Sequence, residues 1–426
     1  MDKFIIEGKT PLQGTIPISG SKNAALPLMA AALLSENAVT LSNIPRLKDI
    51  FTFNNVLRVT GARVDFHENT NTLTIDPTNV HFLEAPYDLV RKMRASFYML
   101  GALLGKYGEA KVSLPGGCAW GPRPVDLHIE GLKALGAKIR IENGYVYANT
   151  PNGRLIGGNI TLNPSSVGAT VNILLGAVLA KGTSVIKNAA MEPDVVSLCN
   201  FLIEMGAEIK GVGTSELTIN GVKELRGSTF RNSPDRIETG TWMIAANMHP
   251  ESKIKLTNCN TKELGMFYKI FSSVTGEMEI TDDTISIQAP ESIPAYSITT
   301  EIYPGFPTDL QAQWATMMTQ ADGKSTVTDT IYNDRFSYIP ELTRLGANIE
   351  FKQNRAIIRG ATPLTGASVM STDLRASVSL VMAAMAAEGQ SEVLRIYHLD
   401  RGYEQMEQKL NAVGARITRA LSEENY

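Results

Sequence analysis

The sequence predicts a mixed α/β protein made of six copies of one unit, divided between two domains. Three observations carry this prediction. The chain of 426 residues is too long for one compact core. A short glycine-containing pattern recurs six times at intervals of about 70 residues. An apolar segment rich in alanine and glycine lies upstream of each of these glycines.

Each copy of the pattern predicts the end of an amphipathic helix followed by a strand. A glycine there can take the left-handed backbone conformation that other residues resist. Alternating apolar residues then indicate a strand, as in LKALGAKI (132–139) and LTRLGANI (342–349). Gly276 is the weakest copy, because Glu277 replaces the usual alanine. The six glycines are Gly61, Gly136, Gly206, Gly276, Gly346 and Gly414.

A second helix is predicted upstream of each glycine. These segments are apolar around most of their circumference, so we expect helices that are buried on all sides. A strand follows each of them, which makes the unit strand–helix–strand–helix–strand–strand. Three such units would close into a pseudo-threefold body with helices inside and sheets outside. The six helices are expected to begin near Asn23, Arg94, Ser166, Arg236, Asp309 and Asp373.

A domain boundary is predicted near residues 231–235, a polar, proline-containing segment between the third and fourth units. We therefore expect one domain over residues 22–232 and a second over residues 1–21 with 233–426. The first strand, residues 3–8, precedes the first unit and could pair with either domain.

Composition excludes several classes of protein. The net charge of -3 argues against a general nucleic-acid binder. The longest apolar run, residues 24–34, is shorter than the ~20 residues of a membrane span, and no secretory signal is evident. Three sparse cysteines, without Cys-x-x-Cys or His-x-x-x-His, favour a reduced, cytoplasmic location and argue against structural zinc.

The starts of the buried helices predict anion binding. Backbone N–H groups at a helix start carry partial positive charge, so a cation there is unfavourable unless an anion is bound. Lys22, Arg94 and Arg375 fit that case. For Ser166 and Thr308 we expect ordinary capping. Asp309 follows a stiff Pro-containing turn, and general base and N-cap are equally good interpretations of it.

Cys118 is predicted to be reactive. It lies in a loop rich in glycine and proline, 115–124, five residues before Arg123. Cations lower the pKa of a thiol, and exposure makes the thiol reactive. Cys199 instead lies inside an apolar helical segment, where a buried hydrophobe is expected.

Eight segments carry a resemblance that extends over essentially the whole chain. The sequence resembles the enolpyruvyl transferases of the EPSP synthase-like superfamily, and among them the UDP-N-acetylglucosamine 1-carboxyvinyltransferase family. The resemblance implies two inside-out α/β barrel domains of three βαβαββ repeats each, with the active site in the cleft between them. The segments are SGSKNAALP (19–27), APYDLVRKMRAS (85–96), LPGGC (114–118), RPVDLH (123–128), DRIETG (235–240), GFPTD (305–309), TDLRA (372–376) and DRGYE (400–404).

The resemblance also implies an activity. It is the transfer of the enolpyruvyl group of phosphoenolpyruvate to the 3′-hydroxyl of UDP-N-acetylglucosamine, the first committed step of peptidoglycan synthesis and thus of cell-wall growth and division. Cys118 would protonate phosphoenolpyruvate and would be alkylated by fosfomycin, and Asp309 would be the general base. No metal or organic cofactor, nucleic acid or membrane is implied, and a monomer is favoured.

Further roles are implied position by position. Phosphoenolpyruvate would be held by Lys22, Asn23, Arg123 and Arg401. Asp373 and Arg375 would support the elimination step, and Arg335 with Arg375 would help to close the domains. The residues implied to bind UDP-N-acetylglucosamine are Arg94, Arg123, Pro124, Val125, Asp126, Leu127, Pro164, Ser165, Ser166, Val167, Asp309 and Ile331.

Two alternatives remain at this point. An enolpyruvylshikimate-phosphate synthase would share the fold and the mechanism, but Cys118 and the RPVDLH segment argue against it. A catalytically inactive paralogue that binds the nucleotide sugar is a different class of protein. The joint presence of Lys22, Cys118, Asp309 and Arg401 argues against that alternative.

Overall fold

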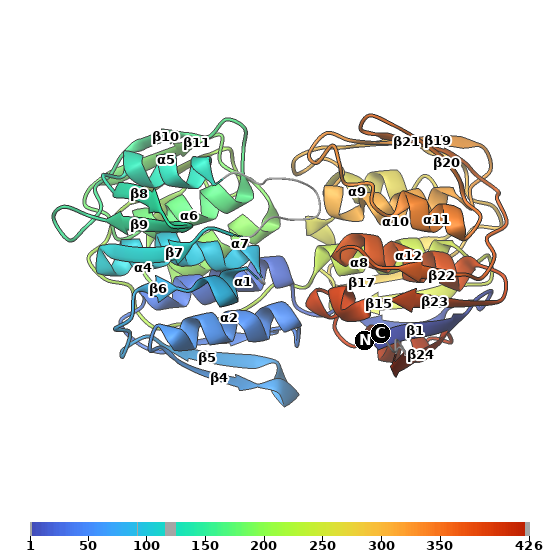
Figure 1. Ribbon diagram of the computed structural model, residues 1–426, viewed down its shortest axis with the longest axis horizontal. Coiled ribbons are helices and arrows are strands. Elements are labelled where there is room, and N and C mark those ends of the chain that lie inside the picture. The colour runs from blue at the N-terminus through green and yellow to red at the C-terminus, as the bar shows by residue number, and fades with distance from the viewer. Residues whose placement is uncertain (1, 92, 116–124, 422–426) are drawn as a thin grey trace. The chain divides into compact units, whose positions relative to one another are not determined.

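The computed structural model describes residues 2–91, 93–115 and 125–421, and Figure 1 shows their arrangement. The described residues form two compact units. The central unit runs from Gly20 to Ser233, and the terminal unit contains the residues up to Ser19 and those from Pro234 onward. Each unit contains three four-stranded sheets and three buried helices. The mixed α/β fold with repeated sheets is therefore confirmed.

The central unit is built around three helices whose side chains are almost all buried: α1 (Lys22–Ala31), α4 (Met99–Tyr107) and α6 (Val167–Ala177). Three more helices bury one face only: α2 (Lys48–Val59), α5 (Asp126–Ala134) and α7 (Pro193–Glu204). A 3-10 turn, η3 (Arg94–Tyr98), leads into α4. The strand order of the first sheet is β14 (Thr229–Arg231)–β3 (Val39–Ser42)–β5 (Thr72–Asp76)–β4 (Arg63–His67). The order of the second sheet is β6 (Glu84–Ala85)–β7 (Glu109–Ser113)–β9 (Tyr145–Asn149)–β8 (Lys138–Glu142). The order of the third sheet is β10 (Asn159–Thr161)–β11 (Thr183–Lys187)–β13 (Glu216–Asn220)–β12 (Glu208–Lys210).

The terminal unit repeats this plan. Its buried helices are α8 (Arg236–Asn247), α10 (Gln311–Met318) and α12 (Leu374–Ala386). The shorter helices are α9 (Gly265–Phe271), α11 (Ile339–Arg344) and α13 (Met406–Asn411), with 3-10 turns η5 (Thr308–Leu310) and η6 (Ile396–Arg401). The strand order of its first sheet is β22 (Ser368–Met370)–β23 (Gln390–Leu394)–β1 (Asp2–Glu7)–β24 (Arg416–Leu421). The order of its second sheet is β2 (Gln13–Pro17)–β15 (Lys253–Thr257)–β17 (Thr284–Gln288)–β16 (Met278–Ile280). The order of its third sheet is β18 (Ile298–Thr300)–β19 (Lys324–Asp329)–β21 (Arg355–Arg359)–β20 (Asn348–Lys352).

All six sheets share one pattern of pairing. One edge strand is parallel to its neighbour and the other two contacts are antiparallel, as in β14–β3, β3–β5 and β5–β4. Alternate residues of the central strands face the core, because a strand turns successive side chains to opposite faces. Ile75 on β5, for example, is fully buried and lies opposite Val39 on β3 and Val64 on β4.

The expected first strand is β1, and it lies between β23 and β24, beside which it is drawn in Figure 1. Two parallel edge strands, β2 and β14, each belong to a different unit from the helix that follows them in sequence. β2 precedes α1 in sequence but pairs with β15 of the terminal unit, whereas β14 precedes α8 but pairs with β3 of the central unit. The chain therefore passes from one unit to the other directly after each of these strands.

Five of the six predicted glycine caps are confirmed. Gly61, Gly136, Gly206, Gly346 and Gly414 all have positive φ angles, between 86° and 108°. The prediction for Gly276 is wrong, because its φ is not positive. The first core-facing strand residue comes three positions after the other glycines but two after Gly276, where Met278 pairs with Ile287. The shorter connection removes the left-handed turn.

Close approach of the buried helices depends on small residues. A Cβ atom at Gly101 of α4 would lie 2.2 Å from the backbone oxygen of Asn172 on α6. Only glycine fits at this contact, which brings the two backbones together. Within the residues that the structure describes, no helix is long and apolar enough to cross a membrane.

Candidate functional site

A carboxylate held by two arginines is the centre of the candidate site in the terminal unit. Asp309 lies in η5, and its Oδ1 is 2.8 Å from Nη1 of Arg335. Its Oδ2 is 3.2 Å from Nη2 of Arg375, the second residue of α12. Both arginine side chains are buried, whereas the Asp309 side chain is 26% exposed. The carboxylate is therefore the part of this cluster that a ligand can reach.

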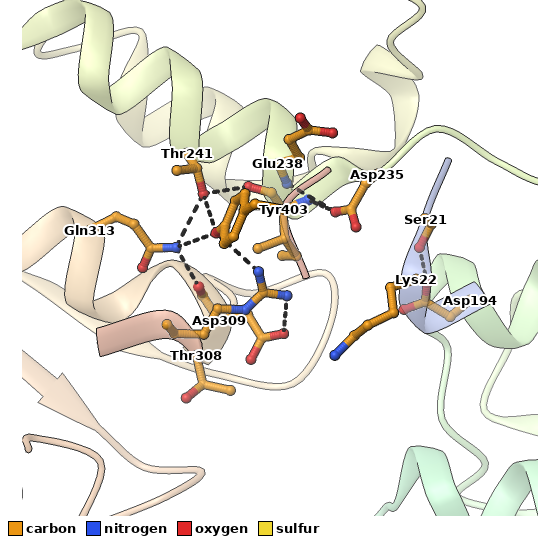
Figure 2. A network of polar contacts seen from close by, with 12 residues as sticks. Ser21, Lys22, Asp194, Asp235, Glu238, Thr241, Thr308, Asp309, Gln313 and Tyr403 are labelled. Atoms are coloured by element: carbon orange, nitrogen blue, oxygen red, sulfur yellow. Dashed lines mark hydrogen bonds and ion pairs between the residues drawn. The ribbon is translucent and has the colours of Figure 1, made fainter. Parts of the chain in front are cut away.

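The position of Arg375 is fixed by a buried network of neutral groups. Its Nη1 donates to the hydroxyl of Tyr403 over 3.0 Å, and that hydroxyl lies 2.9 Å from Oγ1 of Thr241 on α8. Gln313 on α10 donates to the Thr241 hydroxyl and to the backbone oxygen of Asp309. Figure 2 shows Thr241 and Gln313 both in contact with the Tyr403 hydroxyl. Residues of α8 and α10 thus hold the Tyr403 hydroxyl, and that hydroxyl fixes the guanidinium group of Arg375 on α12.

The ionisation states in this cluster follow from burial and charge. Burial alone would lower the pKa of Arg375, but Tyr403 and the carboxylates of Asp309 and Asp235 raise it above its ordinary value. Burial raises the pKa of Tyr403, so its phenol stays neutral. The guanidinium keeps its charge inside the protein. An ionised carboxylate is the form that accepts a proton, and neighbouring guanidinium groups favour that form.

The capping interpretation of Asp309 and the expected capping by Thr308 are both wrong. The N-cap of η5 is Pro307, and no side chain caps this turn. The Thr308 hydroxyl instead donates to Oδ2 of Asp329 over 2.7 Å and accepts from Arg335 over 3.0 Å. The buried Asp329 at the end of β19 also accepts the backbone N–H of Ile331, 2.9 Å away. It thereby shapes the turn that carries the predicted contact Ile331.

Asp373 and Arg401 lie on two neighbouring elements of the same unit. Asp373 is the N-cap of α12, where its Oδ1 accepts the backbone N–H groups of Arg375 and Ala376. Its Oδ2 accepts from the Ser337 hydroxyl over 2.9 Å. Arg401 is the last residue of η6 and is half-buried. Burial, and then the charge of Arg401, lower the pKa of His398 in this turn.

In the central unit, Lys22 is the first residue of α1 and lies 3.3 Å from Oδ2 of Asp49 on α2. Ser21 caps α1 by accepting the Ala24 N–H and donates to Asp194, a pair drawn in Figure 2. Each of these two cations thus has a carboxylate beside it in the structure, Asp49 beside Lys22 and Asp309 beside Arg375. Asn23, the next residue of α1, is half-buried.

Arg94 and the starts of α5 and α6 form a second group in the central unit. Arg94 begins η3, and its charge contributes to the lowered pKa of the buried His128 on α5. The predicted residues Val125, Asp126 and Leu127 surround the start of α5, and Asp126 is exposed. Ser166 caps α6 by accepting the Ala169 N–H, as expected. Ser165 and Val167 are half-buried beside it, and Pro164 is exposed.

Three predicted site residues, Cys118, Arg123 and Pro124, lie outside the described residues. The other two cysteines are buried, and burial raises the pKa of each of their thiols to about 12. The expectation that Cys199 is a buried hydrophobe is therefore confirmed.

Several residues that organise the site were missed by sequence reasoning: Thr241, Gln313, Asp329, Tyr403, His128 and Asn172. Polar residues inside otherwise apolar helices were the available signal for Thr241, Gln313 and Asn172. A polar side chain is costly there unless it has a hydrogen-bond partner. Their side-chain partners lie 44 to 162 residues away in the sequence, so the pattern could not name them.

Comparison with known proteins places the chain among enolpyruvyl transferases. The family model described as EPSP synthase (3-phosphoshikimate 1-carboxyvinyltransferase) matches residues 6–410. A UDP-N-acetylglucosamine 1-carboxyvinyltransferase of Chloroherpeton thalassium is 51% identical over 425 residues, which cover 100% of this chain and 98% of the relative. The enzyme of the same name from Pelodictyon phaeoclathratiforme is also 51% identical, with 100% of both chains covered.

Solved structures share the fold. The enolpyruvyl transferase NikO from Streptomyces tendae superimposes with a TM-score of 0.90 at 24% identity, covering 99% of both chains. EPSP synthase from Acinetobacter baumannii superimposes with a TM-score of 0.74 at 17% identity, covering 99% of this chain and 100% of that one. At 24% and 17% sequence identity, these two superpositions show a shared fold alone.

Proposed function

The chain belongs to the EPSP synthase family, and from this we propose that it transfers the enolpyruvyl group of phosphoenolpyruvate to UDP-N-acetylglucosamine. One observation carries the choice of acceptor. Relatives named UDP-N-acetylglucosamine 1-carboxyvinyltransferase are 51% identical over the full chain, whereas the EPSP synthase of solved structure is 17% identical. Phosphate is the second product.

The reaction that we propose has two steps. In the first, the sugar 3′-oxygen bonds to the central carbon of phosphoenolpyruvate while the methylene carbon gains a proton, which gives a tetrahedral ketal that still carries phosphate. In the second, the new methyl group loses a proton, the carbon–carbon double bond re-forms and the bond to the phosphate oxygen breaks. Atoms and charges balance without an oxidant or a further reactant.

We assign the proton transfers to two residues. Cys118 protonates the methylene carbon, and Asp309 takes the proton of the sugar hydroxyl. The support for Asp309 is its geometry, because its carboxylate is partly exposed while Arg335 and Arg375 hold both oxygens in place. Pre-positioned charges of this kind stabilise the charge that develops in a transition state.

We assign the substrate-binding roles to cations and to helix starts. Lys22, Asn23, Arg123 and Arg401 would hold the phosphate and carboxylate of phosphoenolpyruvate. Arg94, the start of α5 and the start of α6 would bind the nucleotide sugar. Helix starts offer N–H donors to anions, which supports this assignment for α6. Asp373 and Arg375 would act in the elimination step.

Release of inorganic phosphate from phosphoenolpyruvate tests the proposal. We expect release that depends on UDP-N-acetylglucosamine and not on shikimate 3-phosphate. Release with shikimate 3-phosphate alone would assign the chain to the enolpyruvylshikimate-phosphate synthases. Binding of the nucleotide sugar without any release would indicate the inactive, sugar-binding alternative.

A matched pair of variants tests the role of Asp309. Asp309→Asn keeps the size of the side chain but removes its ability to accept a proton, so turnover should fall by about 100-fold or more. Asp322→Asn, an exposed carboxylate of the same unit outside the site, should leave turnover unchanged. Equal turnover of Asp309→Asn and the wild type would remove Asp309 from the mechanism.

A further inference from the structure

A fully buried carboxylate is joined through one hydroxyl to an arginine that holds Asp309. Asp329 is the last residue of β19 and is 0% exposed. Its side chain accepts four hydrogen bonds, three at Oδ1 and one at Oδ2. A carboxylate is costly to remove from water unless its partners compensate. The groups that the two oxygens hold therefore indicate what Asp329 does, and the proposed function assigns it no role.

The Oδ1 atom of Asp329 organises the turn that follows β19. It accepts the backbone N–H groups of Ile331 and Tyr332 over 2.9 and 2.8 Å. It also accepts the hydroxyl of Thr300 on the neighbouring strand β18, over 2.8 Å. The Thr300 hydroxyl accepts the N–H of Thr330 in turn, so it is the hydroxyl proton that faces Asp329. Oδ1 thus shapes the turn that carries Ile331, an implied contact of the nucleotide sugar.

The Oδ2 atom of Asp329 acts on another part of the site. It accepts the hydroxyl proton of Thr308 over 2.7 Å. A hydroxyl has one proton and two lone pairs, so Thr308 presents a lone pair to Arg335. Nη1 of Arg335 donates to Oγ1 of Thr308 over 3.0 Å and lies 2.8 Å from Oδ1 of Asp309. One nitrogen with two N–H bonds therefore bridges Thr308 and Asp309, which Figure 2 shows beside each other.

The turn held by Oδ1 also contributes to the position of Arg335. The ring centre of Tyr332 lies 5.7 Å from the guanidinium carbon of Arg335. The backbone oxygen of Tyr332 accepts the N–H of Arg335 over 3.1 Å. A guanidinium group that is already fixed stabilises a developing charge without having to reorganise. Both oxygens of Asp329 therefore act on the same arginine, one through a hydroxyl and one through the backbone of the turn.

We propose that Asp329 is a positioning residue for the general base. Its Oδ2 keeps a lone pair of the Thr308 hydroxyl turned towards Arg335, and Arg335 is thereby held against Oδ1 of Asp309. The inference rests on the proposed function, which makes Asp309 the base. It separates two effects of one side chain. The Oδ2 contact should govern turnover, whereas the Oδ1 contacts should govern binding of the nucleotide sugar through the turn at Ile331.

Asp329→Asn separates the two contacts without changing the shape of the side chain. Two backbone N–H groups and a hydroxyl proton point at Oδ1, so the new amide oxygen must lie there and its NH₂ group must face Thr308. The Thr308 hydroxyl then meets a donor, and its proton is free to turn towards Arg335. We expect kcat to fall by about 10- to 100-fold, the range for one hydrogen bond to a charged group. KM for UDP-N-acetylglucosamine should not change, because the turn is kept.

Thr308→Val and Thr308→Ser form a matched pair that leaves Asp329 in place. Valine has the shape of threonine but accepts no hydrogen bond from Arg335, so kcat should fall as it does in Asp329→Asn. Serine keeps the hydroxyl and should retain most of the turnover. Thr326→Val, at a half-buried position of β19, is the control and should match the wild type.

The double variant Asp329→Asn/Thr308→Val tests whether the two residues act through one contact. If Asp329 acts on Arg335 through the Thr308 hydroxyl, Asp329→Asn should cost little further kcat once that hydroxyl is gone. A purely structural role of Asp329 predicts that the two losses multiply, because the turn and the Thr308 contact would then be independent. Multiplied losses would overturn the proposal.

Other outcomes also overturn it. Unchanged kcat in Asp329→Asn would do so, as would a raised KM without a fall in kcat, or a loss in Thr308→Ser as large as in Thr308→Val. Circular dichroism shows whether each variant folds. If Asp329→Asn does not fold, the Thr308 pair decides, and equal kcat of Thr308→Val and the wild type rejects the proposal.

The outcome is separable from the proposed function. Phosphate release by the wild type with UDP-N-acetylglucosamine, together with unaffected Asp329→Asn and Thr308→Val variants, would reject the role of Asp329 alone. Absence of phosphate release in the wild type would reject the proposed function itself.

Discussion

The carboxylate of Asp309 shows how single residues of this site obtain their properties from distant parts of the chain. Two of its partners, Arg335 and Arg375, come from a loop and from α12. The phenol of Tyr403 is neutral, so it accepts a hydrogen bond from Arg375 without neutralising the charge of the guanidinium group. Sequence reasoning could identify Asp309 as an acid at a helix start. It could not choose between base and cap, because the deciding contacts join residues 26 and 66 positions apart.

Two of the three thiols of the chain, those of Cys199 and Cys259, are buried, and this predicts where an epoxide reacts. Burial raises the pKa of Cys199 and Cys259 to about 12, so both remain unreactive thiols at neutral pH. Fosfomycin should therefore add once per chain, at Cys118, during turnover. Intact-mass measurement followed by peptide mapping checks this. Cys118→Asp should stay unmodified and retain phosphate release; an adduct on Cys199 or Cys259 would refute the prediction.

The buried His128 predicts a dependence of stability on pH. The unfolded chain binds a proton on this group as the pH falls through 6.5, whereas the folded protein does so only near pH 3. The free energy of unfolding therefore falls as the pH drops below 6.5, by about 2 kcal/mol between pH 7 and pH 5. Urea unfolding at both pH values should show His128→Phe losing about that much less stability than the wild type. Equal losses in the two proteins would contradict the pKa assignment.

At the scale of elements, local patterns predicted most of the helices and caps, because an apolar stripe or a glycine acts within a few residues. The buried helices α1, α6, α8 and α12 begin within one residue of the expected positions. The prediction of a left-handed cap at Gly276 is wrong because one fewer residue separates this glycine from the first core-facing residue of its strand. The same glycine pattern therefore does not guarantee the same turn.

Gly206 isolates the energetic contribution of a left-handed cap. Its φ is 108°, and an added Cβ would meet nothing within 4 Å. Gly206→Ala should therefore cost about 1–2 kcal/mol of unfolding free energy through backbone strain alone. Asn200→Ala, at an exposed position of the same helix, should cost nothing or stabilise slightly. Equal unfolding free energies of Gly206→Ala and the wild type would contradict the role of the cap.

At the scale of the whole molecule, the exchange of β2 and β14 is what the sequence could not predict. Both strands are short and polar at several positions, and each precedes a helix of one unit while pairing with a sheet of the other. Strand partners separated by about 190 to 240 residues leave no local signal. The six repeats predicted the six buried helices, whereas the pairing of strands between repeats came only from the structure.

The N-terminal strand β1 should stabilise the terminal unit selectively. It lies between β23 and β24, so deletion of residues 2–7 leaves β24 without its partner. Hydrogen exchange should show lost protection in β23 and β24 and unchanged protection in the central unit. Lys3→Gln removes only the ion pair with Glu392 and should have little effect, because that pair is partly exposed. Uniform loss of protection over both units would contradict this.

The mass of the nucleotide-sugar product tests the central claim most directly. After incubation with phosphoenolpyruvate in D₂O, we predict UDP-N-acetylglucosamine whose mass has increased by one enolpyruvyl group. Part of that product should carry deuterium in the methylene group, because the methylene carbon is protonated from solvent-exchangeable Cys118 and then loses a proton again. Recovery of unmodified UDP-N-acetylglucosamine, with shikimate 3-phosphate converted instead, would contradict the account.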